Sequence, residues 1–265
     1  MRAGPLAAGA GLAAVLVLLT GAAVTAMQAP ARDLVVATPA PQGGAPTGGP
    51  PAAPLSRGGA RPGTPAAPLG GGGVPRGTPV PVVDEVWLAR TAAAAGLPVP
   101  ALRAYARATL RAPDGCALGW TTLAGIGWVE SGHGTVGGRV LADDGRPSSP
   151  ILGPALDGRG PVAAIPATEQ STGWHGDPDW DHAMGPMQFI PSTWETWASD
   201  GDGDGLADPH DLDDAAYAAA RYLCADGHDL TTGAGWSAAV HSYNHDDAYV
   251  ETVRSAAMAY AERTG

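Results

Sequence analysis

The chain has 265 residues and a formal net charge of −11, and its charge and aromatic residues are unevenly distributed. Residues 1–81 hold five Arg and one acid, whereas the remainder holds ten Arg and twenty-five acids. No Trp, Tyr or Phe precedes Trp87, and a stretch without aromatics has little from which to build a core. We therefore expect one folded domain over 82–265, whose acidity excludes nucleic-acid binding through phosphate neutralisation.

Residues 1–28 have the pattern of an export segment. Arg2 is the only charged residue before Arg32, and the run between them is apolar. This run is longer than the roughly 7–15 residues typical of a cleaved signal and close to the roughly 20 that span a bilayer. A signal peptide cleaved near Ala26 and a retained membrane anchor both fit. Either would place the domain outside the cytoplasm.

Residues 29–81 are rich in Pro, Gly and Ala and lack hydrophobic periodicity. This composition predicts a disordered, semi-extended linker. At about 3.1 Å per residue, such a linker reaches on the order of 150 Å. It suits a domain that works at a distance from its membrane, and a passive spacer fits equally well.

The rest of the chain predicts a mainly α, or α+β, domain. Asp residues or Pro at helix starts and Gly at helix ends support this reading. We expect helices over 84–96, 100–110, 117–130, 213–226 and 246–263. Strand signals are weak. The Gly-, Pro- and Asp-rich segment 137–183 predicts a long irregular insertion that lines a site.

The two cysteines are Cys116 and Cys224. An even count in an exported chain favours a disulfide, and this is the one pairing within the chain. It would join the start of one expected helix to the end of another. Two buried free thiols are the alternative.

One carboxylate stands out among the expected helices. Leu123, Ile126 and Glu130 follow i, i+3, i+7 spacing, so Glu130 shares a stripe with apolar residues. Apolar surroundings disfavour the ionised form, so we expect a raised pKa, as a general acid near neutral pH requires. Ser131 and Gly132 follow at once and place Glu130 at a helix end. The alternative is an ordinary glutamate exposed at a helix terminus.

Two segments resemble signatures of a known family. Residues 128–134, Trp-Val-Glu-Ser-Gly-His-Gly, resemble the catalytic Glu-Ser segment of lysozyme-like lytic transglycosylases. Residues 184–194, Met-Gly-Pro-Met-Gln-Phe-Ile-Pro-Ser-Thr-Trp, are similar to that family's second signature. Further similarities follow in order at 220–224, Gly227, 242–244 and 249–250. The resemblance covers about 82–265 and is closest to the membrane-bound B subfamily in its exported actinobacterial form.

The resemblance implies a lysozyme-like fold and a monomeric enzyme that cleaves peptidoglycan glycan strands. Glu130 would protonate the oxygen of the MurNAc–GlcNAc bond. The sugar's own N-acetyl group would stabilise the intermediate. Glu130, now a base, would deprotonate the 6-hydroxyl to close a 1,6-anhydro ring. Neither a second essential carboxylate nor a catalytic cofactor is needed, unlike in the usual two-carboxylate glycosidase. The supporting residues would be Ser131, Gln188, Tyr243 and Asn244, with Gln188 bonding substrate and the last two positioned near Glu130.

The segment before the second signature departs from the family pattern. Ala167-Thr-Glu-Gln170 stands where relatives carry an acidic run of the type Asp-Thr-Asp, followed here by Trp174-His-Gly-Asp177. This departure bears on subsite preference rather than on Glu130. Trp174 and Trp180 could stack on sugar faces or be buried. For Met187 and Phe189, core packing and sugar contact are both open.

Residues 200–211 fit an EF-hand loop. Asp occupies loop positions 1, 3, 5, 9 and 12, Gly occupies position 6, and a carbonyl is expected from position 7. The expected structural calcium ligands are Asp200, Asp202, Asp204, Leu206, Asp208 and Asp211. Position 12 is usually Glu, and the shorter Asp predicts weak binding or altered geometry. A solvated acidic loop is the alternative.

Three other functions compete with the transglycosylase. His241 and His245 have a zinc-ligand spacing, but Ser242 follows the first His where a metallopeptidase would carry Glu. A hydrolytic muramidase would differ in using water in place of the 6-hydroxyl. A non-catalytic wall-binding module would leave Glu130 dispensable.

Overall fold

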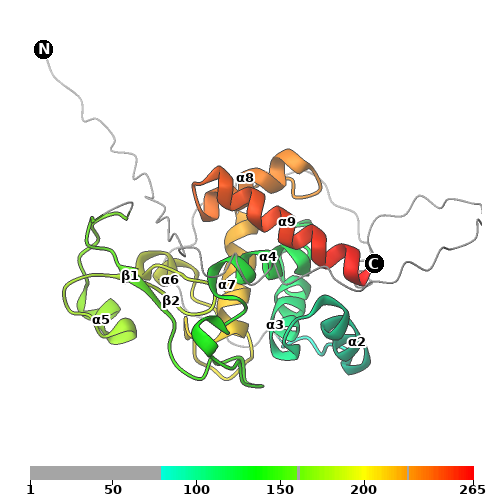
Figure 1. The fold of residues 1–265 in the computed structure, drawn as a ribbon, viewed down its shortest axis with the longest axis horizontal. Coiled ribbons are helices and arrows are strands. Elements are labelled where there is room, and N and C mark those ends of the chain that lie inside the picture. Colours follow the sequence, from blue (N-terminus) through cyan, green and yellow to red (C-terminus); the bar gives the residue numbers. More distant parts are fainter. Residues whose placement is uncertain (1–78, 160–161, 226) are drawn as a thin grey trace, which may run out of the picture.

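The computed structural model describes residues 79–159, 162–225 and 227–265. The expected segment 1–28 and the expected linker, apart from its last three residues, lie outside the described residues. The described part is mainly helical, which confirms the expected fold class (Figure 1). Its eight α-helices are α2 (Glu85–Ala95), α3 (Val99–Leu110), α4 (Trp120–Ser131), α5 (Glu169–His175), α6 (Pro191–Trp197), α7 (Leu212–Ala225), α8 (Gly233–Tyr243) and α9 (Asp247–Thr264).

The five expected helices form within a few residues of their expected bounds, because their ends carry local signals. Asp84 caps α2 by accepting a 2.7 Å hydrogen bond from the Trp87 backbone N–H. Gly96 ends the same helix in the left-handed conformation, with φ 72°. Asp246 caps α9, where its side chain accepts a hydrogen bond from the Ala248 backbone N–H. Short polar side chains at N-caps and Gly after the last turn are the strongest local determinants of helix ends.

Helices α5, α6 and α8 were not expected. Helix α8 begins Gly-Ala-Gly, a sequence of low helix propensity, so packing decides its conformation. Gly235 in this helix comes so close to the Asp229 backbone that a side chain would collide with it. Thr232 caps α8 by accepting from the Gly235 N–H at 3.0 Å.

Helix α4 lies at the centre of the helical part and packs against α3, α7 and α9. Residues 122–127 are all buried, so the middle of α4 is a core helix and does not have the one-sided apolar stripe that the spacing of Leu123 and Ile126 indicated. A Cβ at Gly125 would lie 2.8 Å from the Val253 carbonyl oxygen of α9. One at Gly127 would collide with the Tyr105 hydroxyl of α3. These glycines let neighbouring elements approach α4 closely.

A disulfide joins Cys116 to Cys224, as expected. Cys116 lies in the connection between α3 and α4, and Cys224 lies in the last turn of α7. The bond links positions 108 residues apart in sequence. It therefore ties the connection that follows α3 to the end of α7, and these two helices pack against each other.

The expected irregular insertion contains a 3-10 turn at Val136–Gly138, strand β1 (Leu152–Ala155) and helix α5. Strand β2 (His182–Met184) follows and pairs with β1 in an antiparallel ribbon, with Leu152 opposite Met184 and Ala155 opposite His182. In Figure 1 this ribbon lies with α5 and α6 on one side of the molecule, and α2 and α3 lie on the other.

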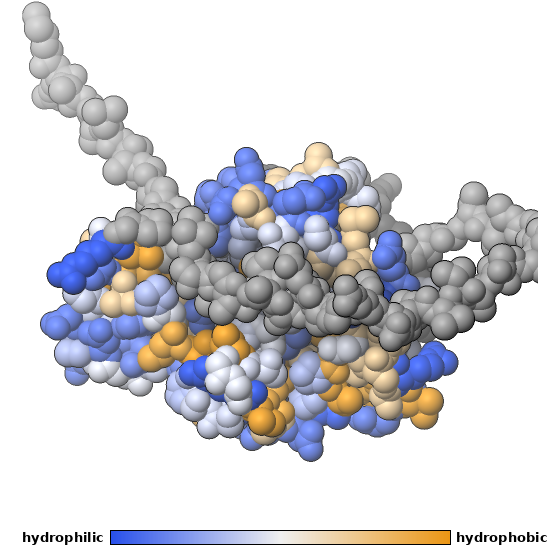
Figure 2. Space-filling view, viewed as in Figure 1, coloured by the Kyte–Doolittle hydropathy of each residue, from blue (hydrophilic) through white to orange (hydrophobic). Residues whose placement is uncertain are grey.

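Polar and apolar residues alternate in small areas over the visible face of the domain (Figure 2). None of the described helices is long and apolar enough to span a bilayer.

Candidate active site

Glu130 lies in the last turn of α4 and is only partly exposed. Burial of its carboxyl raises the pKa from 4.5 to about 7, which confirms the expected direction. The Tyr249 hydroxyl donates a 2.6 Å hydrogen bond to Oε1, and this bond lowers the pKa by less than burial raises it. Glu130 can therefore both release and take up a proton near neutral pH.

The backbone turns sharply after Glu130. Gly132, His133 and Gly134 are all left-handed, with φ values of 57°, 60° and 83°. Ser131, expected to bind substrate, is fully buried. Its hydroxyl donates to the Pro186 carbonyl at 2.6 Å and accepts from the Gly134 N–H at 2.8 Å. Ser131 thus ties the end of α4 to the second signature segment and has no exposed surface for a ligand.

His133 anchors this turn to two other helices through hydrogen bonds. Its Nδ1 lies 3.0 Å from the Tyr105 hydroxyl, and its Nε2 lies 2.9 Å from the Tyr260 hydroxyl. Burial lowers its pKa to about 3, so the ring is neutral and uses one nitrogen as donor and the other as acceptor. These bonds offset the strain of a left-handed non-glycine residue. No local pattern in the sequence indicates this role of His133.

Residues 184–189 form a tight turn beside the end of α4. The Met184 and Phe189 backbones exchange hydrogen bonds of 2.8 and 3.0 Å across it. Gln188 is left-handed, with φ 51°, and its Nε2 donates to the Gly185 carbonyl at 2.8 Å. Gln188 remains partly exposed. Met187 and Phe189 are buried, so core packing is the role that the structure shows for them.

The end of α8 and the start of α9 complete the site. The Tyr243 hydroxyl donates to the Met187 carbonyl at 2.8 Å. Burial raises the Tyr243 pKa well above 10, and the negative charge of Glu130 raises it further. Asn244 is buried at the C-cap of α8. Tyr243 thus interacts electrostatically with Glu130, and Gln188 lies in the turn beside the end of α4. Asn244 follows Tyr243 in sequence, and the roles of all three residues toward a substrate stay predictions.

The hydrogen bond from Tyr249 to Glu130 was not expected from the sequence. Tyr249 belongs to the family similarity at 249–250, which implied no role for it. No local spacing relates it to Glu130, because the two lie on different helices. Tyr249 is buried on the first turn of α9, and burial raises its pKa well above 10, with the Glu130 charge adding to the effect.

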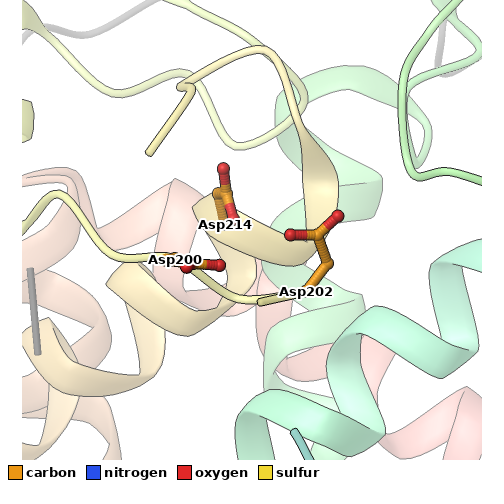
Figure 3. A group of neighbouring side chains, drawn as sticks. All are labelled: Asp200, Asp202 and Asp214. Carbon is orange, nitrogen blue, oxygen red and sulfur yellow. The ribbon is translucent and has the colours of Figure 1, made fainter. Parts of the chain in front are cut away.

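A cluster of carboxylates lies between the predicted calcium loop and the start of α7. Asp200, Asp202 and Asp214 place one carboxylate oxygen each within 4.8 Å of one another (Figure 3). Asp214 comes from α7 and was not among the expected ligands. Its Oδ1 accepts from the Gly201 N–H at 2.6 Å and its Oδ2 from the Asp208 N–H at 2.8 Å. Carboxylate oxygens are the donor type that calcium takes, although it needs about 6–8 oxygen ligands, so these three could form only part of a site.

The other expected ligands have different contacts. Asp208 pairs with Arg146, and Asp211 lies 3.4 Å from the same guanidinium. Asp204 accepts from the Leu206 N–H at 2.7 Å. Burial raises the pKa of Asp214 to about 8, with hydrogen bonds opposing the rise and the nearby charges of Asp211 and Asp202 adding to it. A bound cation would relieve this repulsion.

The two histidines considered for zinc do not belong to a group of three or more possible metal ligands among the described residues. His241 and His245 have ring centroids 5.2 Å apart. Within the described ranges, the one group of three or more ligand-type side chains close enough to share an ion is the aspartate cluster.

Comparison with known proteins gives one match. Residues 170–263 match the family model of the Transglycosylase SLT domain. No curated protein and no solved structure matches the chain. The match extends from α5 to α9 and includes Gln188, Tyr243, Asn244 and Tyr249, whereas Glu130 precedes it. It shows that this part of the chain is similar to transglycosylase SLT domains.

Proposed function

We propose that this chain is a peptidoglycan lytic transglycosylase that cleaves the MurNAc–GlcNAc β-1,4 bond, with Glu130 as its acid and then its base. The observation that carries the proposal is the Glu130 carboxyl, with a pKa of about 7 and a hydrogen bond from Tyr249. Tyr249 belongs to the segment that matches the transglycosylase family model. One hydrogen bond thus joins the candidate acid to the segment that matches the family model.

The proposed reaction uses one carboxyl group twice, first as an acid and then as a base. Protonated Glu130 gives its proton to the bridging oxygen as the glycosidic bond breaks. The N-acetyl oxygen of the MurNAc residue stabilises the positive charge at its anomeric carbon. The Glu130 carboxylate then takes the proton of the 6-hydroxyl of that sugar, whose oxygen bonds to the anomeric carbon. A 1,6-anhydro ring forms, no water is consumed, and Glu130 is protonated again.

Tyr249 has a defined part in this cycle. A hydroxyl that donates to a carboxylate stabilises the charged form more than the protonated form. Tyr249 would therefore stabilise Glu130 in the interval between its two proton transfers. Gln188 would hydrogen-bond substrate from the neighbouring turn. Tyr243, held by the Met187 carbonyl, and Asn244 would shape the surroundings of Glu130.

The deciding experiment is mass spectrometry of products released from purified peptidoglycan. Anhydro-muropeptides from the wild type and none from Glu130→Gln are expected. The exposed Glu262→Gln serves as a matched control and should behave as the wild type. Products with a reducing-end sugar would identify a hydrolytic muramidase instead. Binding to peptidoglycan with no product from either protein would identify a wall-binding module.

We also propose a structural calcium ion held by Asp200, Asp202 and Asp214. The remaining loop residues, Asp204, Leu206, Asp208 and Asp211, would complete the loop around it. The ion would fix the start of α7 and takes no part in the proposed reaction. For the N-terminus we propose export through residues 1–28, with residues 29–81 as a linker to the membrane or cell surface, and for the enzyme a monomeric state.

A further inference from the structure

His182, the first residue of β2, has a hydrogen-bond acceptor at each ring nitrogen. Its Nδ1 lies 2.8 Å from the Gly153 carbonyl oxygen, and its Nε2 lies 3.0 Å from Oδ2 of Asp177. A carbonyl and an ionised carboxylate can only accept, so both nitrogens must carry a proton to make both bonds. Asp177 is ionised, because the hydrogen bond from His182 holds its pKa near 2. The geometry therefore requires the cationic form of His182.

The neighbouring His175 has a different pair of partners. Its Nδ1 accepts from the Asp177 backbone N–H at 3.2 Å, and its Nε2 lies 3.2 Å from Oδ1 of Asp181. One donor and one acceptor satisfy the neutral ring. The ring centroids of His175 and His182 are 5.2 Å apart. The titratable groups that these contacts place around His182 are Asp177, His175 and Asp181. Strand β1 contributes the Gly153 carbonyl and no titratable side chain, and α6, which also packs against β2, carries the exposed Glu195.

The Gly153 backbone connects His182 to the candidate site. A Cβ at Gly153 would lie 3.0 Å from Oε1 of Gln188 and 3.2 Å from Cβ of Ala183. The Gln188 side chain therefore rests against bare backbone at Gly153. Its other support is the 2.8 Å hydrogen bond from Nε2 to the Gly185 carbonyl. His182 holds the carbonyl of the same glycine, so it fixes the surface on which the Gln188 amide lies.

We propose that His182 is a positioning residue, which as a cation holds Gly153 and thereby orients Gln188 for glycan binding. This inference rests on the proposed function, because it assigns glycan binding to Gln188. Loss of one imidazole proton turns one of the two bonds into a repulsive contact between lone pairs. Both bonds are made at low pH. One is lost when the ring gives up a proton, and glycan affinity falls with it.

The test uses the full chain carrying Glu130→Gln, which removes both cleavage and the titration of Glu130. The probe is a GlcNAc–MurNAc tetrasaccharide, with Kd measured by calorimetry at pH 5.5 and pH 8. A roughly tenfold weaker binding at pH 8 is expected, the size of effect of losing one charge-assisted hydrogen bond. Adding His182→Arg, a permanent cation with several N–H donors, should abolish the pH dependence. Adding His182→Gln should give weak binding at both pH values. The exposed His228→Arg is the matched control and should keep the dependence.

A second measurement needs no ligand. The imidazole resonances of His182 and the side-chain amide resonances of Gln188 are followed by NMR across the same pH range. They should titrate together. Three results would each overturn the inference. They are a neutral His182 at pH 5.5, Gln188 amide resonances that do not change as His182 titrates, and pH-independent tetrasaccharide binding by the Glu130→Gln chain that keeps His182. A coupled titration without tetrasaccharide binding at any pH would refute the proposed function and leave the coupling standing.

Discussion

The Tyr249 hydroxyl donates a 2.6 Å hydrogen bond to Oε1 of Glu130, a residue 119 positions earlier in the sequence. The bond joins the first turn of α9 to the last turn of α4. These two helices pack along each other, and Gly125 permits their close approach. Packing in the core of the domain therefore sets the environment of the candidate acid.

Tyr249→Phe is expected to shift the pH dependence of cleavage. Glu130 must be protonated to act as the acid, so activity falls as the pH rises through its pKa of about 7. The Tyr249 bond lowers this pKa, and its loss, at about 1.5–3 kcal/mol for a bond to a charged group, would raise the pKa by about one unit or more. The alkaline limb of the kcat profile should move upward, while kcat at its optimum falls roughly tenfold because the carboxylate loses stabilisation.

The control is Tyr217→Phe, which removes a hydroxyl from α7 and should leave the profile unchanged. An unshifted alkaline limb in Tyr249→Phe, with the fold intact by circular dichroism, would contradict the role given to this bond.

Glu130→Gln is expected to stabilise the protein at alkaline pH. The folded-state pKa of about 7 lies above the ordinary value of 4.5, so the folded chain binds the proton more tightly. The associated stability is fully present below about pH 4.5 and is lost as the pH rises through about 7. At pH 8 the variant should exceed the wild type by about 1–2 kcal/mol in free energy of unfolding, after allowance for partial exposure. Near pH 4.5 the two should agree.

Urea denaturation at the two pH values measures this difference. The matched variant Glu262→Gln, at an exposed position, should show none. A wild type as stable as Glu130→Gln at pH 8 would mean that the Glu130 carboxyl is not desolvated in the folded state.

Removal of the disulfide is expected to destabilise the domain by about 2–5 kcal/mol, as is typical for a bond that closes a long loop in the unfolded chain. The double variant Cys116→Ser with Cys224→Ser should therefore unfold at a lower guanidinium concentration. The wild type in excess reductant should match it, because it also lacks the bond. Equal midpoints for oxidised wild type and double variant would show that the bond contributes nothing.

Calcium is expected to raise the melting temperature of the domain, because an ion bound only in the folded state stabilises it. At a free concentration 100-fold above Kd the gain is about 2.7 kcal/mol. Chelation should reverse it, and Asp202→Asn should abolish it, whereas the exposed Asp114→Asn should not. Equilibrium dialysis that finds no bound calcium at millimolar free ion would remove the metal from the proposal.

Local patterns in the sequence were sufficient for much of the fold. Asp84, Gly96, Gly132 and Asp246 mark helix ends through contacts within a few residues, so the corresponding helices were expected close to their observed bounds. The Cys116–Cys224 pairing follows from there being two cysteines. Helix α8 was missed because its Gly-rich start has little intrinsic helix preference, and burial against α7 and α9 compensates for it.

The sequence by itself determined a helical domain, a disulfide and a glutamate beside apolar residues, because each depends on residue type and short spacing. Only the tertiary structure decided the partners of those residues. It placed the Tyr249 hydroxyl against Glu130, placed the Asp214 carboxylate beside those of Asp200 and Asp202, and gave His182 two acceptors. Each of these contacts joins separate elements. Side-chain geometry across a packed core depends on how helices and strands meet, which no local spacing encodes.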